Sequence, residues 1–81
     1  MPNTGISRGF GLAVRKRRIR SGVSQERLAE QAGLHPTYIS MVERGKRNPT
    51  LNVAARLAKA LSVPLPKLVE EAQQARAGHQ K

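Results

Sequence analysis

The chain reads SQERLAEQAGLHPTYISMVER at residues 24–44, and this stretch decides the fold. Apolar residues recur in it at the three- and four-residue spacing of helices, in two runs separated by Gly33 and Leu34. We therefore expect one helix over about 25–32 and a second over about 36–44, with Gly33 making the tight turn between them.

Local signals at the helix ends support these bounds. Ser24 is a good N-cap for the first helix. Pro36 suits the first position of the second helix, because the N–H that proline lacks would have no helical partner there. Gly45 ends the second helix. The side chains expected to face the core are Leu28, Ala29, Ala32, Leu34, Ile39 and Val42.

Three further helices are expected around this stretch, over about 10–21, 51–61 and 66–75. Thr50 is a suitable N-cap for the helix at 51–61. The helix at 10–21 is expected to bury Phe10, Val14 and Ile19. The sequence thus predicts an all-α fold in which five short helices surround one small core.

Both ends of the chain lack clear helix signals. Residues 1–9 contain Pro2, Gly5 and Gly9 and little apolar surface, so we expect a flexible arm there. Residues 76–81 are expected to form a frayed tail. One domain would then occupy residues 10–75.

The composition points to a polyanionic partner. In 81 residues there are 15 Lys and Arg against 5 Asp and Glu, a formal net charge of +10. Ten of those basic residues lie in residues 1–50, the half that holds the central stretch. Nucleic acid is the simplest partner for such a field. Solubility and attraction to an acidic membrane surface are the alternatives.

Other function classes find no support in the sequence. No apolar run approaches the ~20 residues of a membrane span, and residues 1–9 lack the apolar stretch of a signal peptide. There is no cysteine, and the two histidines, His35 and His79, lack metal-ligand spacing. No catalytic constellation or phosphate-binding glycine loop is present either. We expect no enzyme activity, metal, cofactor or small-molecule ligand.

Two helices joined by a tight turn, in a basic chain, are typical of a helix-turn-helix that binds DNA. In this arrangement the second helix enters the major groove and the first crosses the backbone. The exposed side of the second helix then needs short or polar side chains, and Thr37, Tyr38, Ser40 and Met41 stand there.

Four segments resemble the XRE family, the lambdoid-repressor-type helix-turn-helix regulators: VSQERLA at 23–29, GL at 33–34, YIS at 38–40 and VERGKRNPT at 42–50. LAKALSV at 57–63 also fits, as do Phe10-Gly11 and Arg18 ahead of the motif. The match covers roughly residues 10 to 70, and the joint pattern is specific where SQE alone is not.

The resemblance implies a set of DNA contacts. Gln25 matches a glutamine that touches a phosphate and supports the recognition helix. Thr37 and Met41 match positions that face bases, with Pro36 and Ser40 at their edges. Met41 either packs on a thymine methyl or fills space between the two helices, since it cannot form bidentate hydrogen bonds.

Further contacts are expected beside the recognition helix. Tyr38 either contacts phosphate, sugar or base, or lays its ring over the helix surface. His35 either reaches a phosphate or serves as a cap. The basic loop that follows the helix is expected to run along the DNA backbone. Its residues are Arg44, Lys46, Arg47 and Asn48.

The resemblance also implies structural pairs. Arg18 and Glu43 match a buried salt bridge between the helix expected at 10–21 and the end of the helix expected at 36–44. The alternative is that they are two separate surface charges. A dimer interface is expected on the last helix. Its candidate residues are Val63, Leu65, Leu68 and Val69. The alternative is that these four residues close the core of the monomer.

We therefore expect a double-stranded DNA-binding transcriptional regulator of the prokaryotic cytoplasm. It would act as a homodimeric repressor or autoregulator on a palindromic operator, with modest direct readout and a larger contribution from DNA shape. Small members of the family include restriction–modification controllers, phage or plasmid repressors, and antitoxins. The rival functions are a protein-interaction adaptor or antitoxin-like partner, and a nonspecific nucleic-acid binder.

Overall fold

The computed structural model describes residues 5–79, with side chains described through residue 76. In that span there is no strand, and the five helices are α1 (Ile6–Ser21), α2 (Gln25–Ala32), α3 (Pro36–Glu43), α4 (Leu51–Ala60) and α5 (Leu65–His79). The predicted all-α class and five-helix architecture are confirmed.

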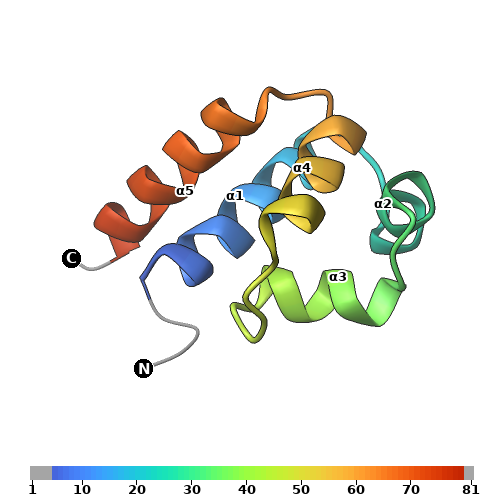
Figure 1. Cartoon of the computed structure of the whole chain (residues 1–81), viewed down its shortest axis with the longest axis horizontal. Helices are drawn as coiled ribbons and strands as arrows, with labels where there is room; N and C mark the ends of the chain where they lie inside the picture. The colour runs from blue at the N-terminus through green and yellow to red at the C-terminus, as the bar shows by residue number, and fades with distance from the viewer. Residues whose placement is uncertain (1–4, 80–81) are drawn as a thin grey trace.

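Helix α1 packs mainly against two of the other helices. This helix lies beside α5, which runs in the opposite direction, and it also packs against α3 (Figure 1). α2 packs against both α3 and α4. As a result α3 lies at one side of the molecule, away from α5 (Figure 1).

The core is aliphatic and draws on all five helices. Its largest fully buried side chains are Val14, Leu28, Ile39, Val42, Leu57 and Leu68. Burying a side chain of this size contributes about 1.5–3 kcal/mol to folding, so a core of few residues stabilises an 81-residue chain. Phe10 is also buried in this cluster.

Two glycines let α1 approach its neighbours closely. A Cβ atom on Gly9 would lie 2.0 Å from the carbonyl oxygen of Ala72 in α5. A Cβ on Gly11 would lie 2.0 Å from the carbonyl oxygen of Val42 in α3. No other residue fits at either position without moving a helix.

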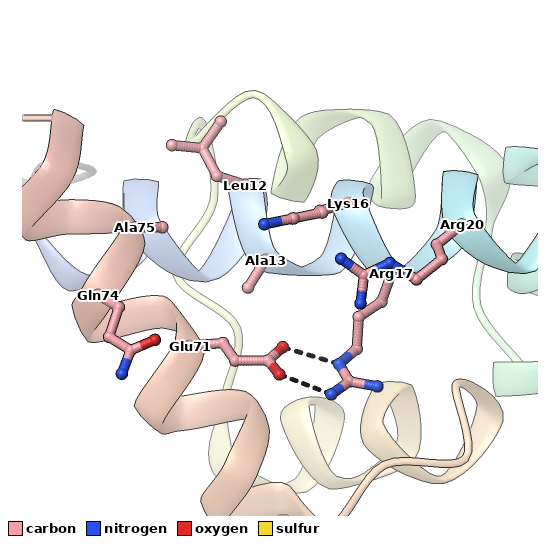
Figure 2. Close-up of a pocket in the computed structure, with 8 residues that line it drawn as sticks. All are labelled: Leu12, Ala13, Lys16, Arg17, Arg20, Glu71, Gln74 and Ala75. Atoms are coloured by element: carbon pink, nitrogen blue, oxygen red, sulfur yellow. Dashed lines mark hydrogen bonds and ion pairs between the residues drawn. The ribbon is translucent and has the colours of Figure 1, made fainter.

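An ion pair also joins α1 to α5. The Arg17 guanidinium donates from Nε and Nη2 to the Glu71 carboxylate, at 2.7 and 2.6 Å (Figure 2). These hydrogen bonds raise the pKa of Arg17 and lower the pKa of Glu71 from its ordinary value. The pair therefore holds α5 onto α1 in the charged form.

The structure corrects the predicted ends of the domain. α1 begins at Ile6, so the part of the expected arm at 6–9 is helical instead, and residues 1–4 lie outside the described span. α5 continues to His79, so most of the expected tail at 76–81 is helical as well. The glycines of residues 1–9 suggested a flexible arm, but Gly9 is buried where α1 packs against α5.

The expected burial of Ile19 is wrong, and for Val63 and Leu68 the alternative, in which they close the core, holds. Ile19 is 54% exposed, because α1 turns that position away from the other helices. Val63 and Leu68 are 6% and 0% exposed and belong to the core, so they are not available to a partner. Leu65 packs against the core from its edge, and Val69 is half-buried.

Candidate nucleic-acid interface

The turn between α2 and α3 has the geometry that the sequence indicated. Gly33 adopts φ 71°, in the left-handed region that favours glycine. The N–H of Leu34 donates to the Ala29 carbonyl at 2.8 Å, and Leu34 packs against the core below the turn. At the start of α3, the Thr37 N–H donates to His35 Nδ1 at 3.1 Å, so His35 is the N-cap.

Arg56 of α4 also holds this turn, and sequence reasoning missed it. Its Nε donates to the Ala32 carbonyl at 3.1 Å and its Nη2 to the Gly33 carbonyl at 2.8 Å. These two carbonyls end α2 without helical partners, so the guanidinium satisfies them. Nothing in the pattern of α4 distinguishes Arg56 from a solvated surface cation.

α3 divides into a buried and an outward side. Ile39, Val42 and Glu43 are buried. Thr37 and Arg44 are exposed, while Ser40 and Met41 are half-buried. Because 37, 41 and 44 follow one another at helical spacing, they form a single row along the outer side of the helix. Pro36 is half-buried at the first helical position.

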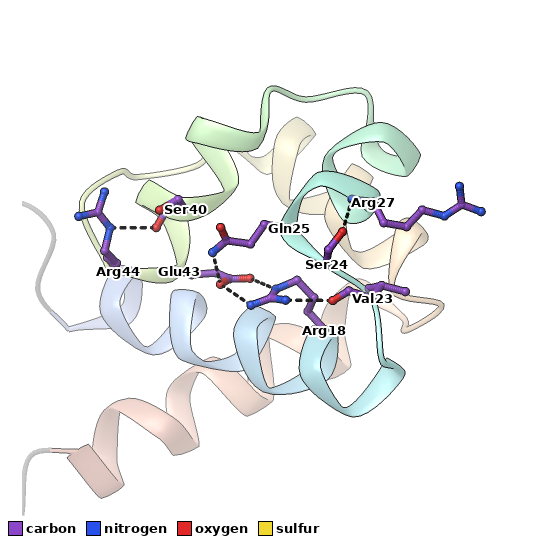
Figure 3. Close-up of polar contacts among 8 residues, drawn as sticks. All are labelled: Arg18, Val23, Ser24, Gln25, Arg27, Ser40, Glu43 and Arg44. Carbon is purple, nitrogen blue, oxygen red and sulfur yellow. Dashed lines mark hydrogen bonds and ion pairs between the residues drawn. The ribbon is translucent and has the colours of Figure 1, made fainter.

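A buried polar cluster supports this helix from below (Figure 3). Arg18 and Glu43 form the implied salt bridge, with Arg18 Nε 2.6 Å from Glu43 Oε2 and side chains only 11% and 1% exposed. Arg18 Nη1 also donates to the Val23 carbonyl at 2.9 Å. Gln25 Nε2 donates to Glu43 Oε1 at 3.0 Å. One carboxylate thus ties α1, α2 and α3 together.

A basic loop follows α3 and is anchored at both ends. The Lys46 N–H donates to the Met41 carbonyl at 2.8 Å, which closes the end of the helix. The Asn48 Oδ1 atom accepts a hydrogen bond from the Ser7 hydroxyl in the first turn of α1. The loop cations Lys46 and Arg47 are exposed. The loop therefore presents its charges from a fixed position.

Tyr38 takes an intermediate position. Its side chain is half-buried and packs against the core, and the Arg47 guanidinium lies 5.5 Å from the centre of its ring. At this distance a cation and an aromatic face attract each other. Tyr38 thus supports the basic loop from the side of α3.

The comparisons with known proteins agree with this geometry. The Helix-turn-helix family model matches residues 14–68. The control protein C.SmaI of Serratia marcescens is 54% identical over 56 residues, which are 69% of this chain and 67% of that protein. The chain belongs to the helix-turn-helix family. It is a DNA-binding transcriptional regulator of the XRE type, as the sequence predicted.

Two solved structures are similar to this regulator. The restriction-modification controller protein C.AhdI from Aeromonas hydrophila has a TM-score of 0.73 and 41% identity, covering 75% of this chain and 92% of its own. The controller protein C.Esp1396I, solved as a tetramer in complex with its natural 35 base-pair operator, has a TM-score of 0.80 and 29% identity. That match covers 89% of this chain and 95% of the other.

A metal site and a membrane-spanning helix are both absent from the described part of this regulator. Residues 5–76 hold no group of His and acidic side chains suited to a metal ion. The His79 side chain lies outside the described residues. Within the same part of the chain, no helix is long and apolar enough to cross a membrane.

Proposed function

We propose that this regulator binds its operator as a homodimer, with one α3 in the major groove of each half-site. The observation that carries the proposal is the outward row of Thr37, Met41 and Arg44 on a helix whose other side is fixed by the buried Glu43. A rigid helix that presents a short row of side chains has the shape that the major groove admits.

Within this row, we assign base contact to Thr37 and Met41. The Thr37 hydroxyl donates or accepts a hydrogen bond at a base edge, and Met41 packs its thioether against a thymine methyl. Pro36 and Ser40 border this contact. Because neither Pro36 nor Met41 forms bidentate hydrogen bonds, DNA shape supplies much of the specificity.

Gln25 holds a backbone phosphate at the start of α2. One hydrogen of its amide donates to Glu43, and the second hydrogen on the same nitrogen remains for a phosphate oxygen. The helix N-terminus adds free N–H groups and a positive dipole end. His35 caps α3 through Nδ1, which leaves its Nε2–H for a phosphate oxygen, and the Tyr38 hydroxyl reaches the DNA backbone from the start of α3.

The basic loop neutralises further phosphates beside the groove. Its cations are Arg44, Lys46 and Arg47, and Asn48 contributes an uncharged amide that can donate to a phosphate oxygen. A loop anchored to Met41 and Ser7 loses little conformational freedom on binding.

Dimerisation places two half-sites about one helical turn apart on the DNA. Of the four residues considered from the sequence, Leu65 and Val69 keep accessible surface for a partner chain. The similarity to a control protein and to a restriction-modification controller protein favours a controller role here. We propose that this chain fills it as a repressor or autoregulator. We place this non-catalytic role in the prokaryotic cytoplasm.

A selection experiment tests the proposal. A library of random duplexes is titrated with the protein in a gel-shift assay, and the bound pool is sequenced. The proposal predicts an enriched palindromic site, and it predicts that Thr37→Ala changes the preference at one position of each half-site. An unenriched pool favours charge-driven binding, and absence of binding favours a protein adaptor; either contradicts the proposal. Glu30→Ala, on the exposed side of α2, is the matched control.

A further inference from the structure

A cleft of about 550 Å³ opens between α1, the start of α2 and the end of α3. Three arginines line it: Arg8 and Arg15 from α1, and Arg44 from the end of α3. Gln25 and Ser40 also face it. Since Arg44 belongs to the outward row of α3, the cleft adjoins the surface assigned to DNA.

Close contacts hold the two α1 arginines beside α3. A Cβ on Gly45 would lie 3.3 Å from the Arg8 Cα atom, so the end of α3 rests on the first turns of α1. The contact of Gly11 with the Val42 carbonyl continues this approach one turn further. Arg8 and Arg15 are seven residues apart and therefore lie on the same side of α1.

The charge in this cleft is not balanced by the protein. Among residues 5–76, no ion pair joins Arg8, Arg15 or Arg44 to an acid. Glu43 borders the cleft, but its oxygens accept hydrogen bonds from Arg18 and Gln25. Three guanidinium groups around one opening repel each other, and an anion between them relieves that repulsion.

We propose that this cleft seats one backbone phosphate of the DNA, held by Arg8, Arg15 and Arg44. A guanidinium donates to phosphate oxygens through parallel N–H groups, and three of them surround a phosphodiester from different directions. The Gln25 amide faces the same cleft and donates to the phosphate oxygens from its edge. This inference rests on the proposed function and adds α1 to the DNA-binding surface.

Two other cations of α1 lie outside this cleft. Lys16 and Arg20 lie along the groove between α1 and α5, beside the Arg17–Glu71 pair (Figure 2). Both are exposed. The same charge can therefore be removed from one helix either inside or outside the proposed seat, which supplies a matched control.

The salt dependence of binding tests the seat. We compare Arg8→Gln/Arg15→Gln with Lys16→Gln/Arg20→Gln on a duplex of random sequence, measuring log Kd against log salt. Losing one neutralised phosphate lowers the slope by about 0.9. We expect a slope lowered by up to that amount in the first variant, which keeps Arg44, and an unchanged slope in the second. Equal slopes for the two variants overturn the proposal. All four positions are exposed, and thermal melting verifies that both variants fold.

A second arm locates the phosphate. Neutral methylphosphonate linkages replace single phosphates of the enriched duplex in turn. We expect one position per half-site at which neutralisation weakens wild-type binding strongly but has a smaller effect on Arg8→Gln/Arg15→Gln, which keeps only Arg44 of the three arginines. Additive losses at every position overturn the seat. A flat pool in the selection contradicts the proposed function alone, because the salt slope on random duplex still decides the cleft.

Discussion

Replacing Glu43 by alanine tests the buried cluster below α3. The substitution removes the acceptor of three hydrogen bonds, two from Arg18 and one from Gln25. Arg18 is only 11% exposed and keeps a single bond, to the Val23 carbonyl. Breaking a buried ion pair in this way costs about 3–5 kcal/mol, because a charge is left without its partner.

The expected change in melting temperature is large. In a domain of this size, 1 kcal/mol shifts Tm by about 4–8 °C. Glu43→Ala should therefore lower Tm by at least about 12 °C, measured by far-UV circular dichroism. Glu30→Ala is the control. In the ion pair of Glu30 with Arg27 both side chains are exposed, so the pair contributes no more than about 1 kcal/mol to stability.

A double variant separates charge from packing. Arg18→Met/Glu43→Met removes both charges and keeps apolar volume, so it should be more stable than Glu43→Ala. A Tm for Glu43→Ala within a few degrees of wild type would refute the reasoning. A double variant less stable than the single one would show that an orphaned arginine did not cause the effect.

Three further outcomes are expected. Gly11→Ala should destabilise the fold by about 1–3 kcal/mol in urea unfolding, although alanine favours helix, because its Cβ meets the Val42 carbonyl; a stabilised variant would contradict this contact. The Arg17 guanidinium lowers the pKa of Glu71 from its ordinary 4.5, so stability present at neutral pH should fall as pH drops through the lowered value, and Glu71→Gln should flatten that fall. Arg47→Ala should weaken binding to all duplexes and lower the salt slope by about 0.9; a loss confined to one sequence would argue against a phosphate contact.

The central helices were predictable because their signals are local. Ser24 and Pro36 mark helix starts, Gly33 marks the turn, and each acts on backbone no more than three residues away. The bounds of α2 agree with the prediction, and α3 ends one residue earlier, at Glu43. The Arg18–Glu43 pair came from family resemblance, since nothing in the spacing alone distinguishes it from two surface charges.

What the sequence did not predict depends on contacts between distant segments. Gly9 looked like part of a flexible arm, yet its missing side chain admits the backbone of α5. Arg56 and the α1 arginines looked like solvated charges. Their roles follow from neighbours 23 residues or more away, such as the Gly33 carbonyl that Arg56 binds. No local pattern records such a partner.

The central claim is that the outward row of α3 reads DNA bases. Repeating the duplex selection with Met41→Gln tests it most directly, because glutamine can bond bidentately to adenine while methionine cannot. We predict a palindrome that changes toward adenine at one position of each half-site and stays the same elsewhere. Enrichment of the unchanged wild-type site by a folded Met41→Gln protein would contradict the account.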